Sequence, residues 1–380
     1  MALLLNEEQR MLRDSAQTFL DTRSPVAALR ALRDRRDERG YDPEVWGAIA
    51  ELGWPACALP EAYGGLGVGY QGLGAVFEQV GRTLAATPLL STVVLGAGLL
   101  TELGSAAQRD LWLPRIAAGE AILALALEET PRHDPTQASL RAERESGGWR
   151  LDGAKEFVLD GHVADALLVV ARSAGVAGQS HGLSVFMVDP AAPGVRIERT
   201  WMVDSRNAAR VQLAGVRLGD DALLGAPDLA FDALERVLDR ARALAAAELL
   251  GVIGEAFERT VRYLKERVQF DAPIGAFQAL QHRAARLYVE RELLRSCVAA
   301  ALEAADDASA GDAAALASLA KARASDLSQH ALNEAVQMHG GVGVTDALDI
   351  GLFLKRGRVL QQAFGDGAYH RERYARLRGF

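Results

Sequence analysis

The segment from Leu229 to Phe380 restricts the fold most strongly, because almost nothing in it interrupts a helix. It holds a single proline, Pro273, and the strong helix formers Ala, Leu, Glu and Arg dominate the rest. Four long helices fit this segment, at about 229–268, 277–306, 312–340 and 346–378. Long helices joined by short connections pack as a bundle. Residues 227–380 are therefore predicted to form a C-terminal four-helix domain.

The residues before this segment divide into a helical zone and a β zone. Residues 1–122 are rich in helical patterns, whereas residues 123–226 contain short β-branched runs bounded by Gly, Pro and Asp, such as Leu167–Ala171. Trp149–Phe157 alternates around Gly153, which predicts a hairpin. The predicted fold class is therefore α+β, with an N-terminal α-helical domain, a middle β-domain and the C-terminal four-helix bundle.

Composition excludes several classes of function. The net charge of −8 and the pI of about 5.5 argue against a nucleic-acid partner. The two cysteines, Cys57 and Cys297, lie far apart without a CxxC motif, so neither a disulfide framework nor a metal site is expected. The N-terminus lacks the pattern of a signal peptide, and no apolar stretch reaches membrane-spanning length. We expect a cytoplasmic protein with no membrane partner.

Two segments of the C-terminal part carry residues that fold stability alone does not require. Residues 267–281 read RVQFDAPIGAFQALQ, and residues 337–341 read QMHGG. This combination resembles the C-terminal half of the acyl-CoA dehydrogenase family, and the order of helices, sheet and four-helix bundle extends the resemblance over essentially the whole chain. The resemblance implies a flavoprotein of lipid metabolism that uses FAD to introduce a double bond between the α and β carbons of an acyl-CoA thioester.

The resemblance also assigns residues that bind FAD. Arg267 and Gln278 match an Arg and a Gln that reach the FAD of a neighbouring subunit, and Phe270 matches an aromatic residue that packs against the cofactor. A guanidinium suits a diphosphate because it offers several directed donors. The alternative interpretation is a helix-end Arg near Glu266 and a core Phe.

A second group of FAD contacts is expected from the segment that follows the third long helix. Gln337, Gly340 and Gly341 match the family's Gln and glycine pair, and consecutive glycines let a ligand approach the backbone closely. Alternatively, these glycines only end a helix. His339 is expected to be a packing residue, because no cluster of metal-ligating residues accompanies it.

The middle domain departs from the family pattern. Where the family has a Trp-Ile-Thr-Asn-Gly strand along the flavin, this chain reads Phe157-Val-Leu-Asp-Gly161. Leu159 offers no hydroxyl in place of the family's Thr. Phe157 can still pack against the flavin ring, so it is included among the cofactor-binding residues.

The catalytic base is absent from both positions in which the family carries it. The usual glutamate precedes a glycine, with an arginine seven residues after the glutamate; here Phe364 occupies that position, although Gly365 and Arg371 keep the register. Some members instead place the glutamate directly before the arginine that matches Arg242, and here that position is Ala241.

Two carboxylates remain close to these positions. Asp366 is the candidate base by its proximity to the usual position, and its alternative role is the N-cap of the following helix. Glu248 lies on the same helical face as Ala241, and its alternative role is an ion pair with a facing helix.

The missing base resembles the pattern in the partner (β or small) subunits of bacterial heterotetrameric acyl-CoA dehydrogenases. In such assemblies one chain supplies the base and the substrate pocket, while the other completes the flavin site. We expect a tetramer, either with a homologous subunit or with itself, and electron-transfer flavoprotein as acceptor. The alternatives are a complete homomeric dehydrogenase that uses Asp366 or Glu248, and a non-catalytic structural or regulatory subunit without FAD.

Overall fold

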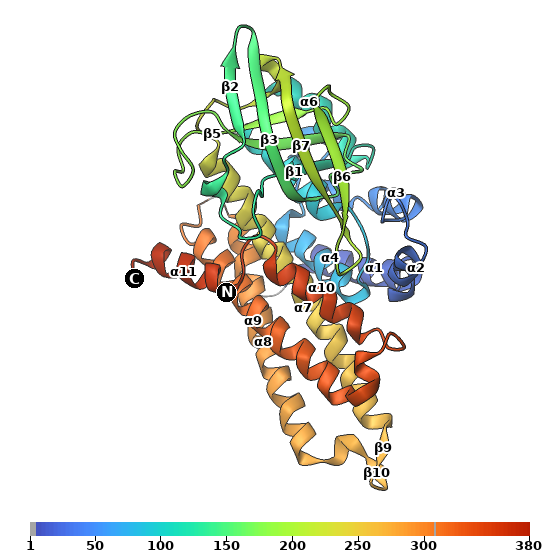
Figure 1. Cartoon of the computed structure of the whole chain (residues 1–380). Helices are drawn as coiled ribbons and strands as arrows, with labels where there is room; N and C mark the ends of the chain where they lie inside the picture. The colour runs from blue at the N-terminus through green and yellow to red at the C-terminus, as the bar shows by residue number, and fades with distance from the viewer. Residues whose placement is uncertain (1–4, 308) are drawn as a thin grey trace. The chain divides into compact units, whose positions relative to one another are not determined.

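The computed structural model describes residues 5–307 and 309–380 and divides into two compact units (Figure 1). One unit consists of the N-terminal segment up to Ala31, residues 70–85 and residues 242–380. The other consists of residues 32–69 and 86–241. Both units receive part of the long helix α7 (Phe231–Glu266), within which the boundary falls.

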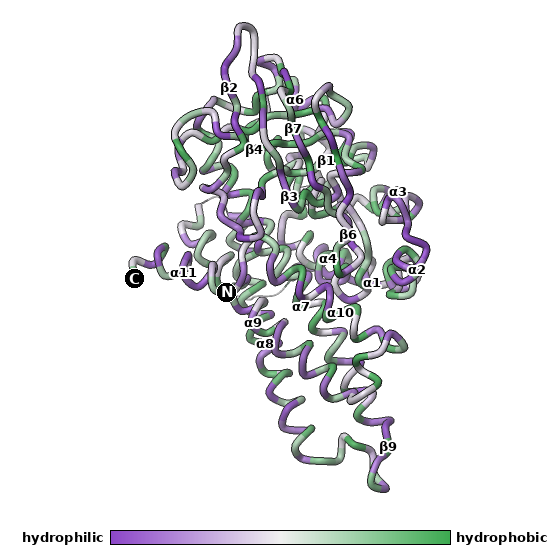
Figure 2. Tube along the Cα trace, viewed as in Figure 1, coloured by the Kyte–Doolittle hydropathy of each residue, from purple (hydrophilic) through white to green (hydrophobic). Residues whose placement is uncertain are grey.

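The second unit contains an eight-stranded mixed sheet. Seven strands follow the order β6-β7-β3-β2-β4-β5-β8, and β1 pairs in parallel with β4. The strands are β1 (Leu123–Ala126), β2 (Arg141–Glu145), β3 (Gly148–Leu159), β4 (Ala166–Arg172), β5 (Leu183–Val188), β6 (Val195–Trp201), β7 (Asn207–Leu218) and β8 (Leu223–Leu224). All residues of β4 are buried, as its hydrophobic composition predicts (Figure 2). The predicted β zone is therefore confirmed.

The predicted hairpin around Gly153 is wrong. Gly153 lies inside the single continuous strand β3, where a φ of 146° and a register shift between Leu151 and Gly153 mark an irregularity in the pairing with β7. The turn of the hairpin lies between β2 and β3. Glycine signals a turn or a bulge equally well from sequence, and here it allows the bulge.

The second unit also contains α3 (Pro43–Glu51), the π-helix η3 (Leu89–Ala97), α5 (Gly98–Leu103) and α6 (Ala106–Ala117), together with the short 3-10 turns η1 (Trp54–Ala56), η2 (Glu61–Tyr63), η4 (Pro135–Gln137) and η5 (Asp220–Ala222). The helix α2 (Val26–Asp34) crosses from the first unit into the second. Asp42 caps α3 through its side chain, and Ser105 forms a capping box with Gln108 at the start of α6.

The first unit is almost entirely helical. It contains α1 (Glu7–Arg23), α4 (Gly69–Thr83), most of α7, α8 (Gln278–Asp306), α9 (Ala313–His339), α10 (Ile350–Gln362) and α11 (Gly367–Arg378). The strands β9 (Val268–Gln269) and β10 (Ala272–Pro273) form a small hairpin, followed by the turn η6 (Ile274–Ala276), and η7 (Gly340–Val344) follows α9. Among the described residues, no helix has the length and apolar character needed to cross a bilayer.

The helices α4 and α7 approach each other closely within this unit. A Cβ atom added to Gly251 of α7 would lie 1.9 Å from the carbonyl oxygen of Glu78, and one added to Gly81 of α4 would lie 2.1 Å from that of Glu248. Glycine at both positions is therefore required by the contact between the two backbones.

The fourth predicted helix of the bundle is divided. The prediction of one helix over 346–378 is wrong, because α10 ends at Gln362 and α11 begins at Gly367. Between them, Phe364 and Gly365 have φ values of 58° and 104°, which an α-helix does not accommodate. The other three predicted helices match α7, α8 and α9 within a few residues, and the α+β class with its order of helices, sheet and helical bundle is confirmed.

Candidate functional site

Six of the seven predicted cofactor residues lie at one end of the helical unit. The end of α7, the start of α8 and the end of α9 meet there, since the Tyr263 hydroxyl donates to the His339 carbonyl at 3.3 Å and Arg283 of α8 pairs with Glu334 of α9 at 2.5 Å. The strands β9 and β10 extend from this end (Figure 1). We call this region the bundle end, comprising residues 263–283 and 334–344.

Arg267, Phe270 and Gln278 are all exposed at the bundle end. The side chain of Arg267 forms no ion pair with any of the described residues, although its backbone N–H donates to Tyr263. Phe270 is 86% exposed and has a φ of 56° in the turn between β9 and β10. Its ring lies 6.1 Å from that of Phe277, centroid to centroid, and contributes little to the core of the chain.

Gln337, Gly340 and Gly341 are exposed at the same end. Gly340 has a φ of 65°, and a Cβ atom added to either glycine would have no other atom within 4 Å. The backbone is therefore open to a ligand here. His339 is buried, stacks on Tyr263 with ring centroids 4.4 Å apart, and makes a 2.7 Å hydrogen-bond contact from Nδ1 to the Ala335 carbonyl. Its predicted packing role is confirmed.

Phe157 belongs to the other unit. It lies near the end of β3, where the pairing with β7 shifts register between Lys155 and Val158. Its φ is 52°, and its side chain is 42% exposed on the described surface of the chain. The bulge turns Phe157 out of the regular alternation of the strand, which leaves an aromatic face available for contact.

The usual position of the base is occupied by Phe364, which is 9% exposed. Its backbone carbonyl accepts a hydrogen bond from Nε of Arg242 at 3.3 Å and another from Nε2 of His370 at 3.0 Å. The other position in the family, Ala241, is a fully buried alanine in α7. Neither position supplies an acid–base group.

The turn between α10 and α11 is held from inside by buried basic side chains. Lys321 of α9 donates from Nζ to the carbonyl of Gly365 at 2.8 Å and to that of Gln361 at 3.1 Å. Burial, together with the charge of Arg242, lowers the pKa of Lys321 to about 7. Burial and the charges of Lys321 and Arg242 lower the pKa of His370 far below its usual value, so its ring is neutral.

The two remaining carboxylates are both engaged. Asp366 is the N-cap of α11, with its carboxylate accepting from the backbone N–H of Tyr369 at 2.8 Å. Glu248 is buried and accepts from Nε and Nη2 of Arg356, each at 2.8 Å. Asp366 therefore acts as a helix cap and Glu248 as a member of an ion pair, as the alternative interpretations of the sequence expect. A role of Asp366 as base stays a prediction.

Comparison with protein families identifies this arrangement. The model for the acyl-CoA dehydrogenase N-terminal domain matches residues 6–120, that for the middle domain residues 125–216, and that for the C-terminal domain residues 231–377. The chain belongs to the acyl-CoA dehydrogenase family. Members of this family are FAD-dependent oxidoreductases that act on CH–CH donors, so the predicted enzyme class and cofactor are confirmed.

Relatives in the acyl-CoA dehydrogenase family cover nearly the whole chain. Acyl-CoA dehydrogenase FadE12 of Mycobacterium tuberculosis is 32% identical over 87% of this chain and 86% of its own length. A variant of the Tcur3481-Tcur3483 steroid ACAD has a TM-score of 0.88 and 34% identity over 99% of both chains. A chain of the ChsE4-ChsE5 complex from Mycobacterium tuberculosis has a TM-score of 0.88 and 27% identity, covering 100% of this chain and 99% of that one.

The residues of this acyl-CoA dehydrogenase fit the cofactor of the family. The bundle end combines a guanidinium without an ion pair among the described residues, an exposed aromatic ring and an open glycine backbone. A diphosphate requires directed donors, and a flat ring system requires an apolar face and close backbone approach. Arg267, Phe270 and Gly340 supply these features.

The acyl-CoA dehydrogenase fold also depends on residues that sequence patterns do not reveal. Lys155 is fully buried and donates to Oε1 of Glu129 at 2.6 Å and to the Leu127 carbonyl at 3.0 Å. Burial by itself raises the pKa of Glu129, but the charge and hydrogen bond of Lys155 bring it below its usual value. Lys155 and Lys321 are not part of any sequence motif. Their structural roles are recognised only from the buried oxygens to which they donate hydrogen bonds.

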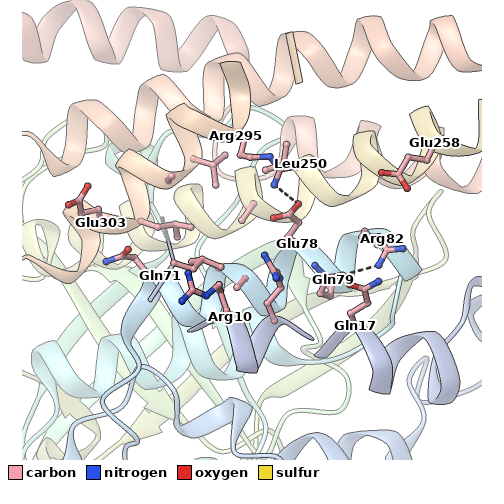
Figure 3. Close-up of a pocket in the computed structure, with 18 residues that line it drawn as sticks. Arg10, Gln17, Gln71, Glu78, Gln79, Arg82, Leu250, Glu258, Arg295 and Glu303 are labelled. Atoms are coloured by element: carbon pink, nitrogen blue, oxygen red, sulfur yellow. Dashed lines mark hydrogen bonds and ion pairs between the residues drawn. The ribbon is translucent and has the colours of Figure 1, made fainter. Parts of the chain in front are cut away.

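A hollow of about 510 Å³ lies among α1, α4, α7 and α8 of the helical unit (Figure 3). Its polar lining is largely paired: Arg295 donates to Glu78 at 2.9 Å, and Arg82 donates to Gln79 at 3.0 Å. Leu250, Val298 and Leu302, together with several alanines, form its apolar part. None of the residues predicted to hold flavin or to act as base lines this hollow, so it is separate from the candidate site.

Proposed function

We propose that this chain is a subunit of an FAD-dependent acyl-CoA dehydrogenase that completes a flavin site together with a homologous partner chain, which supplies the catalytic base. One combination of observations carries the proposal. The bundle end presents Arg267, Phe270 and Gln278 outward, while both positions of the family's base hold the apolar residues Phe364 and Ala241.

The state of the two nearby carboxylates supports a base from another chain. A general base must reach the proton that it removes and have its oxygens available for it. Asp366 uses a carboxylate oxygen to cap α11, and Glu248 is neutralised by Arg356. Asp366 remains the candidate for a base within this chain, and the experiment below distinguishes it from a base supplied by the partner.

The outward direction of the bundle end supports sharing of the flavin between subunits. Arg267 and Gln278 are proposed to hold the FAD of a neighbouring subunit, with Phe270 packing beside it and Gln337, Gly340 and Gly341 approaching through side chain and open backbone. Phe157 is proposed to pack against a flavin ring from the β-domain. When bound, FAD supplies the oxidant for the CH–CH bond of the acyl-CoA thioester.

Assembly with a homologous chain is supported by the relatives and by the surface of α8. The similar ChsE4-ChsE5 structure is a complex. In this chain Tyr288, Val289 and Leu293 of α8 are each at least half exposed, which is typical of a surface that a partner covers. We propose a tetramer built through the C-terminal helices, in the cytoplasm, with electron-transfer flavoprotein as the acceptor.

The proposal is tested by reconstitution with a homologous acyl-CoA dehydrogenase chain from the same organism. We expect the single chain to show no turnover on a panel of acyl-CoA thioesters, and the mixture to show flavin absorbance and turnover. Asp366→Asn in this chain should leave the turnover of the mixture unchanged. Robust turnover by the single chain that Asp366→Asn abolishes would instead establish a homomeric enzyme, and a mixture without flavin would favour a structural subunit.

The flavin assignment has its own test in Arg267→Ala. We expect this variant to lose most of its bound FAD while keeping its fold, because the diphosphate loses a charged donor. Arg262→Ala is the matched control, since Arg262 is an exposed arginine of α7 one turn before the bundle end hairpin. Flavin content and circular dichroism are measured on both, and equal flavin content in the two variants would remove Arg267 from the site.

A further inference from the structure

The helix η3 is an unusual element in the core of the β-domain unit. It is a π-helix of nine residues, all of which are buried. Most π-helical segments are single turns, and they often occur at functional sites. Its first turn contains two fully buried hydroxyl groups, those of Ser91 and Thr92, and buried hydroxyls are expected to have hydrogen-bond partners.

These two hydroxyls connect η3 to different parts of the same unit. The Ser91 hydroxyl lies 2.6 Å from Oδ2 of Asp160 and 3.1 Å from the Pro88 carbonyl. A hydroxyl has one proton to donate, and the shorter contact with a carboxylate is the stronger. Thr92 instead exchanges hydrogen bonds with the backbone of Leu123 at the start of β1. Ser91 therefore holds the turn after β3, and Thr92 holds β1.

The turn after β3 has a conformation that must be held by its surroundings. Asp160 has a φ of 55°, and Phe157, three residues earlier, has a φ of 52°. For residues other than glycine, this left-handed region is unfavourable and persists only where the surroundings hold it. The backbone N–H of Gly161 donates to the Val158 carbonyl at 3.1 Å, which closes a tight turn that begins at the residue directly after Phe157. A constraint on Asp160 therefore bears on the end of β3 that carries Phe157.

We propose that Ser91 and Asp160 are positioning residues, whose hydrogen bond fixes the turn after β3 and so sets the direction of Phe157 for its contact with the flavin ring. This inference rests on the proposed flavin contact of Phe157. It adds to that contact the statement that the buried Ser91 hydroxyl of η3 determines the orientation of Phe157. The flavin environment then depends on a residue that does not touch the cofactor.

The test uses the assembled, flavin-loaded protein. Ser91→Ala removes the donor, and Asp160→Gly removes the acceptor while keeping the freedom to adopt a positive φ. We expect each to weaken FAD binding by about tenfold, the equivalent of one hydrogen bond, and to change the visible absorption and fluorescence of bound flavin. The double variant should weaken FAD binding by less than the two single variants combined, because the Ser91–Asp160 contact is lost in both. Asp160→Asn keeps an acceptor and tolerates the left-handed conformation, so it should behave as the parent protein.

Thr92→Val is the control for a purely structural effect. It also removes a buried hydroxyl of η3, but one that holds β1, so it should lower the melting temperature and leave the flavin spectrum unchanged. If Ser91→Ala leaves both spectrum and affinity unchanged while Arg267→Ala loses flavin, the positioning role is refuted and the proposed function stands. If Arg267→Ala retains its flavin, the failure belongs to the proposed function.

Discussion

The buried ion pair between Glu248 and Arg356 provides a direct test of whether Glu248 has a structural or a catalytic role. Glu248 is 1% exposed and Arg356 is 8% exposed, and two nitrogens of the guanidinium lie 2.8 Å from one carboxylate oxygen. Glu248→Gln keeps the size of the side chain but removes the charge that neutralises Arg356. Leaving one member of a buried pair uncompensated costs about 3–5 kcal/mol. We expect the free energy of unfolding to fall by an amount in that range.

A double-mutant cycle compares the parent protein, Glu248→Gln, Arg356→Met and the double variant, which lacks both charges. In Glu248→Gln/Arg356→Met neither charge of the pair remains, so the loss should be much smaller than in Glu248→Gln alone. The coupling free energy obtained from the four proteins should then be about 3 kcal/mol. Urea unfolding followed by circular dichroism at constant pH measures all four.

Turnover of the assembled enzyme separates the two roles of Glu248. A structural residue lowers stability and leaves the rate per folded enzyme unchanged, whereas a base lowers the rate at almost unchanged stability. A Glu248→Gln variant within about 0.5 kcal/mol of the parent protein, which is the usual range for a surface substitution, would refute the reasoning on the buried pair.

Three further predictions address helix packing and the turn between α10 and α11. Gly251→Ala would place its Cβ 1.9 Å from the Glu78 carbonyl oxygen, so it should lower the free energy of unfolding by about 1–3 kcal/mol. Gly254→Ala is the control and should not lower it, because its Cβ would have no atom within 4 Å. Thermal unfolding compares the two variants. Lys321 has its pKa lowered to about 7 in the folded state, so at higher pH the unfolded chain binds a proton that the folded chain has lost. Stability should therefore rise from pH 7 towards pH 10, and Lys321→Met should flatten that slope in melting temperatures measured across the range. Asp366→Ala should cost about 1 kcal/mol through loss of the cap of α11, and Asp366→Asn should restore most of it; equal stability of the two would contradict the capping role.

Much of the architecture follows from sequence, because helix and strand patterns are local. The long helices α7, α8 and α9 have few interruptions, and the β-branched runs of the middle segment fold as strands. The division of the last helix is only partly indicated by sequence: Asp366 suits an N-cap and Gly365 a positive φ, but Phe364 is not a residue type that signals a positive φ. Its conformation depends on Arg242 and His370, which contact its carbonyl from α7 and α11.

The sequence predicts the part of the candidate site whose residues lie in short continuous motifs. The bundle end combines motifs that are continuous in sequence, and the structure brings six predicted residues together there. The partners of Glu248 and Lys321 lie on other helices, so no local pattern indicates that Arg356 neutralises the first or that Gly365 accepts from the second. The role of such residues depends on which side chains of a neighbouring helix they contact, and this is known only from the packed structure.

The buried basic residues around the turn between α10 and α11 have a consequence for how this chain tolerates change. Arg242, Lys321 and His370 all contact backbone carbonyls of the turn, and none of these hydrogen bonds involves the side chain at position 364. The backbone of the turn therefore does not itself require a phenyl ring at position 364. An exchange at this buried position would act through the burial of the new side chain and not through loss of these hydrogen bonds.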